Sequence, residues 1–177
     1  MEEHRDEAFT GTEPPVVRGR QLQAGDPAPD FRLDYLDLAD LAVRTICLAD
    51  STGWVRLFNV VNSLASPLCQ QVIKRWETLR VVLPPDACIY TVSLDLPQVQ
   101  AAFQETAGVL HQMLSAHRGD RFAQDYGVWL QQQQQLASAV FVLDRQDRIA
   151  YAEYIADQQR EPDYAAALEV VQQAALT

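Results

Sequence analysis

The chain has 177 residues, a formal net charge of −10 and a hydrophobic content of 48%. This length predicts a single domain whose core needs no disulfide or metal to hold it. The acidic balance argues against nucleic acid or an anionic membrane as a partner, because both repel an acidic surface. No apolar run approaches the roughly 20 residues of a membrane span. The acidic start, which lacks an apolar signal core, is typical of a cytoplasmic protein.

The first part of the chain predicts short strands before a long buried one. Residues 1–8 are expected to be a disordered tail, and the folded domain is expected over residues 9–177. Segment 9–19 carries β-like pieces broken by Gly and Pro, which predicts an N-terminal hairpin. Segment 32–48 alternates loosely and is compatible with another hairpin. The nearly continuous apolar run at 54–61 predicts a strand that is buried on both faces.

A helix is predicted directly after that strand, over residues 68–83. Its apolar residues recur at helical spacing: Leu68, Val72, Trp76, Leu79 and Leu83. Ser66 is a good N-cap, and Pro67 suits the first helical position because its missing N–H has no partner there. The helix is therefore expected to begin within a few residues of Cys69.

The later elements alternate between strand and helix. Strands are predicted at 89–94, 139–143 and 149–155, and the last two are joined by a tight turn. One helix is predicted from Pro97, with apolar positions reaching Leu114, and another from Pro162. The glutamine run at 131–135 is predicted to be a solvated loop, with partner binding as the less favoured alternative. This order predicts an α/β fold with a central mixed sheet flanked by helices.

Cys69 is the main candidate for chemistry. It falls in the first turn of a helix, at the carboxyl end of a strand, where ligands of such sheets bind. A helix N-terminus stabilises a thiolate, so Cys69 is a candidate nucleophile. The alternative is an inert thiol, because free cysteine is among the most buried residue types.

The other cysteines and histidines predict neither a disulfide framework nor a metal site. Cys47 and Cys88 precede strands, so both are expected far from Cys69 and unable to pair with it. His111 and His117 are six residues apart, which is not a same-face helical pair. Both are interpreted as solvated helix residues.

Seven segments, in this order and spacing, resemble one known family. They are AGDPAPDF at 24–31, LFNVV at 57–61, the helix turn with Cys69, VSLDLP at 92–97, YGV at 126–128, AVFVLD at 139–144 and EPDYAAAL at 161–168. The chain resembles the thiol peroxidase branch of the peroxiredoxins over residues 9–175. The resemblance implies a thioredoxin-like fold with an N-terminal β-hairpin extension, a homodimer, and no cofactor or metal.

The resemblance also implies a reaction. In this family a peroxidatic cysteine, within a proline-xxx-threonine-xx-cysteine motif, attacks a peroxide and becomes a sulfenic acid. A resolving cysteine on the next helix then forms a disulfide with it, and thioredoxin reduces that disulfide. An arginine at the start of a later strand holds the thiolate and the peroxide. Cys69 matches the peroxidatic position.

The rest of the motif departs from the family pattern. Asn62 stands at the proline position, Ser66 at the threonine, Gln104 at the resolving cysteine and Ser138 at the arginine. Loss of one preorganised donor typically lowers a rate by about 10²–10³. The expectation is a one-cysteine peroxidase with weakened activity toward hydrogen peroxide or small hydroperoxides, reduced by an external thiol such as thioredoxin. Cys69 would be its nucleophile, with Ser66 and Asn62 as donors.

Two alternatives stay open at this point. Ser66 needs no catalytic role, since Ser-Pro is a routine start for a helix. The whole chain could also be a catalytically inactive relative that acts as a redox sensor or as a binding or regulatory module. The missing proline, arginine and resolving cysteine favour this second alternative, whereas the retained Cys69 favours the enzyme.

Overall fold

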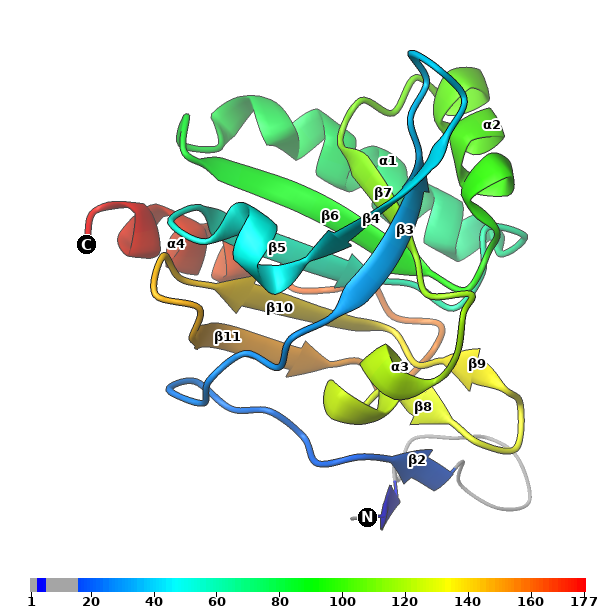
Figure 1. The fold of residues 1–177 in the computed structure, drawn as a ribbon. Coiled ribbons are helices and arrows are strands. Elements are labelled where there is room, and N and C mark those ends of the chain that lie inside the picture. The colour runs from blue at the N-terminus through cyan, green and yellow to red at the C-terminus, as the bar shows by residue number, and fades with distance from the viewer. Residues whose placement is uncertain (1–2, 6–15) are drawn as a thin grey trace.

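A computed structural model describes residues 3–5 and 16–177 of the chain (Figure 1). Its centre is a seven-stranded sheet in the order β11-β10-β5-β6-β7-β3-β4. The strands are β3 (Arg32–Leu36), β4 (Val43–Cys47), β5 (Val55–Val60), β6 (Ala87–Ser93), β7 (Gln112–Ser115), β10 (Ala139–Leu143) and β11 (Ile149–Tyr154). Only β5, β6 and β7 run parallel to one another, so the mixed sheet is confirmed.

A second, four-stranded sheet joins the N-terminus to an internal hairpin. Its order is β1 (Glu3–Arg5), β2 (Val16–Arg18), β8 (Trp129–Leu130) and β9 (Gln135–Leu136). The expected disordered tail is therefore wrong at residues 3–5, which pair with β2. The antiparallel pair of β1 and β2 is not the hairpin predicted within residues 9–19, because its first strand lies in the expected tail, and residues 1–2 and 6–15 lie outside the described residues. The glutamine run supplies the exposed turn between β8 and β9, with its last residue in β9.

Helices cover both faces of the central sheet (Figure 1). They are α1 (Pro67–Leu79), which continues into the 3₁₀ turn η2 (Arg80–Val82), α2 (Pro97–Ala107), α3 (Arg121–Asp125) and α4 (Tyr164–Ala175). A further 3₁₀ turn, η1 (Leu48–Ser51), leads into β5. Helices α1 and α4 pack with β5 and β10 on one face, and α3 packs on the other. None of the helices described is long and apolar enough to cross a membrane.

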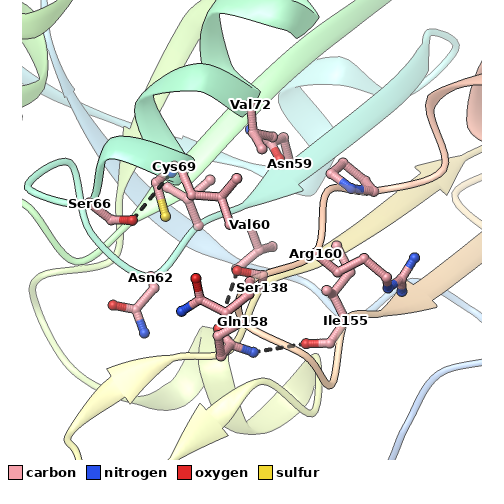
Figure 2. Close-up of a pocket in the computed structure, with 14 residues that line it drawn as sticks. Asn59, Val60, Asn62, Ser66, Cys69, Val72, Ser138, Ile155, Gln158 and Arg160 are labelled. Atoms are coloured by element: carbon pink, nitrogen blue, oxygen red, sulfur yellow. Dashed lines mark hydrogen bonds between the residues drawn. The ribbon is translucent and has the colours of Figure 1, made fainter. Parts of the chain in front are cut away.

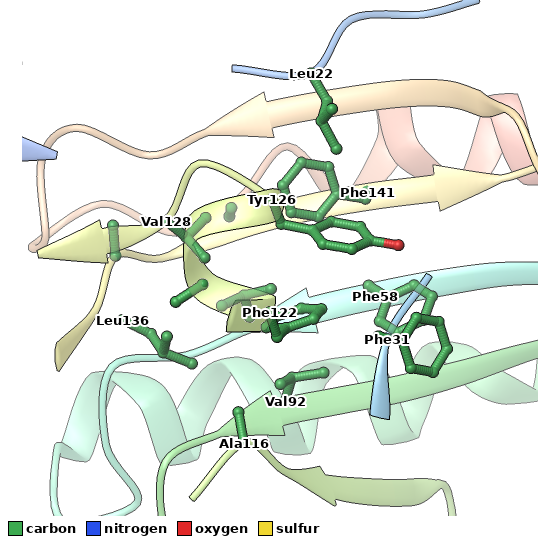
Figure 3. Close-up of a cluster of buried hydrophobic side chains, with 14 of the residues drawn as sticks. Leu22, Phe31, Phe58, Val92, Ala116, Phe122, Tyr126, Val128, Leu136 and Phe141 are labelled. Atoms are coloured by element: carbon green, nitrogen blue, oxygen red, sulfur yellow. The ribbon is translucent and has the colours of Figure 1, made fainter. Parts of the chain in front are cut away.

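A cluster of aromatic rings fills the face of the sheet under α3 (Figure 3). Tyr126 lies at its centre and contacts Phe122, Phe141 and Phe58 at centroid distances of 4.6, 5.3 and 6.2 Å. Its hydroxyl donates a hydrogen bond to the Pro29 carbonyl at 2.8 Å. The cluster thus fixes the segment around Pro29 to β5 and β10, the two strands whose ends reach Cys69.

The helix predicted from Pro97 ends earlier than expected. Gly108 follows Ala107 with φ 69°, the left-handed conformation that commonly ends a helix. Met113 and Leu114 belong to β7 instead, where successive side chains point to opposite faces of the sheet. Two adjacent apolar residues fit either element, so this short strand was missed from the sequence.

The interpretation of both histidines as solvated helix residues is wrong for His111, and for His117 it is wrong only in part, since His117 is exposed but lies in a turn. His111 immediately precedes β7 and is only 4% exposed, with its ring held between Glu77 and Thr91. His117 follows β7, and its Nε2 lies 2.9 Å from the buried Asp34 carboxylate. Both errors come from the same missed strand.

Candidate active site

Cys69 lies where the sequence predicted it, in the first turn of α1 just after β5. Ser66 caps the helix, and its Oγ accepts a hydrogen bond from the Cys69 backbone N–H at 3.3 Å. Pro67 is the first helical residue. Because the Ser66 oxygen is the acceptor in this bond, its hydroxyl hydrogen can still be donated to another group. The structure therefore shows that Ser66 caps the helix. This bond does not prevent the Ser66 hydroxyl from acting as a donor at the site.

The Cys69 side chain borders a cavity of about 190 Å³ (Figure 2). Cys69 itself is 7% exposed. Four parts of the chain form the walls: the end of β5, the start of α1, the residue before β10 and the loop that follows β11. Apolar and neutral polar side chains predominate, and Arg160 is the one charged residue among the described lining residues. This is a small, partly open cavity bordered by a nearly buried thiol.

Asn62 does not offer its amide hydrogens to the cavity. Its Nδ2 donates to Gln135 Oε1 at 3.0 Å and to the Leu136 carbonyl at 3.2 Å. An amide nitrogen carries two hydrogens, so both are already used. Asn62 therefore ties the end of β5 to the β8–β9 hairpin, and it could donate to a ligand only by breaking one of these bonds.

Ser138, at the position of the family arginine, also lines the cavity. Its Oγ donates to Gln158 Oε1 at 3.4 Å, and Gln158 Nε2 donates to the Ile155 carbonyl at 2.8 Å. These polar groups thus bind one another, and none of them brings a positive charge to Cys69.

Arg160, the charged residue of the cavity lining, binds other groups and not Cys69. One guanidinium nitrogen, Nη1, donates to Glu153 Oε2 at 3.2 Å and to the Glu161 carbonyl at 3.4 Å. The side chain is 48% exposed, and Figure 2 shows the guanidinium pointing away from Cys69. No described residue therefore holds a fixed cation against the thiol.

The structure places the other two cysteines away from Cys69, and all three are free thiols. Cys88 lies at the amino end of β6, opposite Arg56 of β5, and packs against the core on the α3 face. Burial raises the pKa of the Cys88 thiol, which opposes formation of a thiolate. Cys47 ends the edge strand β4. Gln104, at the expected resolving position, lies on α2 and donates to the His111 carbonyl at 2.8 Å.

Sequence reasoning did not single out several polar residues around this site, among them Asn59, Gln135, Gln158 and Arg160. The predicted hairpin at 139–155 could have indicated the position of two of them, Gln158 and Arg160. In an antiparallel hairpin, the start of the first strand and the end of the second lie at the same edge. The loop that contains Gln158 and Arg160 follows that second strand, so it had to return toward Cys69 once β10 paired with β5.

Comparisons with known proteins identify the family of this chain. The Redoxin family model matches residues 23–168. A thiol peroxidase from Halalkalibacterium halodurans is 34% identical, with 91% of this chain and 94% of the relative covered. A thiol peroxidase from Bacillus subtilis is 32% identical over 88% of this chain and 90% of the relative.

Solved structures show the same fold. A peroxiredoxin-like protein from Aquifex aeolicus superposes with a TM-score of 0.79 at 25% identity, covering 92% of this chain and 93% of that one. A thiol peroxidase from Chromobacterium violaceum gives a TM-score of 0.75 at 21% identity, covering 93% and 95%. The peroxiredoxin fold and the similarity to thiol peroxidases are therefore confirmed over most of the length, and the chain belongs to the Redoxin family.

Proposed function

We propose that this chain is a thiol peroxidase whose single peroxidatic residue is Cys69. The observation that carries the proposal is the placement of the Cys69 thiol. It is in the first turn of α1, 7% exposed, and it borders a cavity of about 190 Å³. That cavity suits hydrogen peroxide or a small hydroperoxide. The relatives named thiol peroxidase support the enzyme over an inactive sensor or binding module.

The reaction follows from a thiolate next to a peroxide. The sulfur attacks one peroxide oxygen, the O–O bond breaks, and Cys69 becomes a sulfenic acid. The second oxygen leaves as hydroxide or alkoxide and takes a proton from water. The Ser66 hydroxyl, whose hydrogen is not used in the capping bond, is the donor proposed for this chemistry, and the positive end of the α1 dipole favours the same negative charge.

We expect the rate to be below that of an enzyme with a fixed cation at this site. Negative charge builds up on the leaving oxygen, and a preorganised donor there is typically worth about 10²–10³ in rate. Ser138 supplies no charge, Asn62 has already committed its amide hydrogens, and Arg160 is held by Glu153. Asn62 acts in this proposal by holding the end of β5 in place.

We propose that an external thiol completes the cycle. Cys47 and Cys88 lie away from Cys69, and Gln104 carries no sulfur. An external thiol attacks the sulfenic sulfur, releases water and forms a mixed disulfide with Cys69. A second thiol then releases Cys69 and leaves as the oxidised disulfide. A thioredoxin-type dithiol can supply both thiols.

The family also supports two properties of the whole protein. We propose a homodimer, as the resemblance implies, and its molar mass in solution can be measured by light scattering. A cytoplasmic location is consistent with three free thiols, because reducing compartments keep thiols reduced.

Steady-state turnover tests the proposal. Hydrogen peroxide consumption is measured with a thioredoxin reducing system, for the wild type, Cys69→Ser and Cys88→Ser. We expect Cys69→Ser to lose turnover and the matched Cys88→Ser control to retain it. Equal turnover in wild type and Cys69→Ser would contradict the assignment. Loss of turnover in Cys88→Ser, with the fold intact, would contradict the one-cysteine cycle.

A further inference from the structure

Four polar side chains form a continuous hydrogen-bonded network beneath α1 that ends at the Cys69 cavity. Glu77 Oε2, on α1, lies 2.8 Å from His111 Nδ1 and also accepts the His111 backbone N–H at 3.0 Å. His111 Nε2 lies 2.8 Å from Thr91 Oγ1 on β6. Asn59 Nδ2, on the neighbouring strand β5, donates to Thr91 Oγ1 at 3.2 Å. Asn59 lines the cavity, and Figure 2 shows it beside Val72, one helical turn from Cys69.

Three of the four members of this network are shielded from water, and the Glu77 side chain is 15% exposed. His111, Thr91 and Asn59 are 4%, 0% and 1% exposed. A buried polar group without a partner is costly, so each member depends on its neighbour for a hydrogen bond. A change in one of these side chains must therefore be accompanied by a change in the hydrogen bonds of its neighbours.

The directions of the hydrogen bonds follow from the two ionisable groups. Burial lowers the pKa of His111 below its ordinary 6.5, against the opposing effect of Glu77. Burial acts to raise the pKa of Glu77, but hydrogen bonds from the His111 backbone, Arg80 and the imidazole hold it below its ordinary 4.5. Near neutral pH the pair is thus a carboxylate and a neutral imidazole. His111 Nδ1–H donates to Glu77, the Thr91 hydroxyl donates to Nε2, and Asn59 donates to Thr91.

Few charges act on His111. Glu77 and Arg80, from α1 and η2, are the charged groups that face it among the described residues. The elements on its other sides present neutral groups, Thr91 from β6 and Gln104 from α2. Protonation of His111 is therefore the one change of charge in this network within the ordinary range of a histidine.

Protonation would reverse the middle of the network. A protonated imidazole has hydrogens on both nitrogens, so Nε2 becomes a donor and Thr91 Oγ1 must accept. The Thr91 hydrogen then needs another acceptor. The Asn59 carbonyl oxygen becomes available if the amide turns over, and this rotation changes the group that Asn59 presents at the cavity.

We propose that Glu77, His111 and Thr91 are positioning residues that orient the Asn59 amide at the Cys69 cavity, so that protonation of His111 changes the rate at which peroxide oxidises Cys69. This inference rests on the proposed function. It concerns the orientation of an amide rather than proton delivery, because an amide does not pass a proton along.

The first test is a pH profile of the rate at which peroxide oxidises reduced Cys69, measured by stopped flow between about pH 5 and 8. Thr91→Val keeps the shape of the side chain and His111 but removes the linking hydroxyl. We expect the rate of this variant at pH 8 to differ from the wild-type rate by about threefold to tenfold, the factor for one neutral hydrogen bond. It should also lose the His111-dependent step in the profile. Thr91→Ser, which keeps the hydroxyl, should restore both.

His117→Gln is the matched control, since His117 binds Asp34 away from this cavity. It should keep the wild-type rate and the wild-type step. A Thr91→Val profile with the wild-type step would overturn the proposal, and so would loss of the step in His117→Gln.

A second test needs neither a variant nor peroxide activity. The side-chain amide signals of Asn59 and the ring signals of His111 are followed by NMR over the same pH range in the wild type. We expect both to move with a common midpoint. Asn59 signals that stay fixed while His111 titrates would overturn the inference, as would a His111 that stays neutral throughout. A wild type in which peroxide leaves Cys69 unoxidised at every pH would instead refute the proposed function, while the NMR titration still decides this inference.

Discussion

The two ends of β5 differ in how they hold a positively charged side chain. At the amino end, Arg56 is fully buried and its guanidinium donates to the Ser51 carbonyl, the Asp144 carbonyl and Asp147 at 2.7 to 2.8 Å. At the carboxyl end lies the Cys69 cavity, where the one charged lining residue described, Arg160, is half exposed and held by Glu153.

The cation at the amino end of β5 therefore affects the stability of the fold, and the lack of one at the carboxyl end affects the reactivity of Cys69. A buried guanidinium is tolerated only where acceptors surround it, and those acceptors come from turns that the sheet brings together. At the Cys69 end, the polar side chains satisfy one another instead, as Asn62 does with Gln135 and Ser138 with Gln158. The described part of the chain therefore has a fixed cation that supports the fold and none that supports the thiolate.

Removing the cation at the amino end is expected to have the largest effect. Arg56→Met leaves Asp147 and two carbonyl groups without their partner. We expect the free energy of unfolding to fall by about 3 kcal/mol. Urea denaturation measures it, and Arg121→Met, whose side chain is 93% exposed, should change it by less than about 0.5 kcal/mol. Equal effects of the two substitutions would contradict the structural role of Arg56.

Adding a cation at the carboxyl end is expected to raise the rate. Ser138→Arg places a guanidinium at the cavity beside Cys69. We expect peroxide to oxidise Cys69 about tenfold faster, less than the full contribution of a preorganised donor because the new side chain is not held in advance. Stopped-flow rates of the wild type, Ser138→Arg and the neutral control Ser138→Met test this. A gain shared by both variants would point to cavity shape rather than charge.

Arg160 is expected to contribute little, because solvent screens it and Glu153 holds it. Arg160→Gln should lower the rate of Cys69 oxidation by no more than about threefold. The effect should shrink further at high salt. A loss of about a hundredfold would show that Arg160 swings into the cavity during the reaction and would erase the contrast between the two ends of β5.

His111 is buried like Arg56, but the two differ in charge. Burial keeps His111 neutral, whereas Arg56 stays charged because acceptors surround its guanidinium. The folded state disfavours protonated His111, while the unfolded chain protonates it near its ordinary pKa of 6.5. The free energy of unfolding should therefore fall as the pH decreases below about 7, and this contribution levels off below the folded-state pKa. His111→Gln should flatten this part of the pH dependence. Urea denaturation at several pH values measures the slopes, and an unchanged slope in His111→Gln would contradict a buried neutral imidazole.

Local sequence signals were enough for the elements that carry Cys69. The apolar run at 54–61 became β5, and Ser66 and Pro67 took the N-cap and first helical positions of α1 for which their residue types are suited. These features depend on burial and capping, which neighbouring residues determine. The same holds for the β10–β11 hairpin, whose turn residues lie between two apolar runs.

Longer-range features were not predictable in this way. Strand β7 is short and follows directly on a helical pattern, so the burial of His111 against Glu77, 34 residues away, left no local mark. The bonds of Asn62 depend on Gln135, 73 residues away, in a glutamine run that looked like solvent-exposed loop. Side-chain pairing of this kind is set by how the strands assemble.

The most direct test of the central claim is a single-turnover labelling experiment. The reduced protein is exposed briefly to near-stoichiometric hydrogen peroxide with a sulfenic-acid trap present, and the intact mass is measured for the wild type and Cys69→Ser. Rapid addition of one label to the wild type and none to Cys69→Ser is the expected result. No label, or slow labelling spread over all three cysteines, would contradict a peroxidatic Cys69.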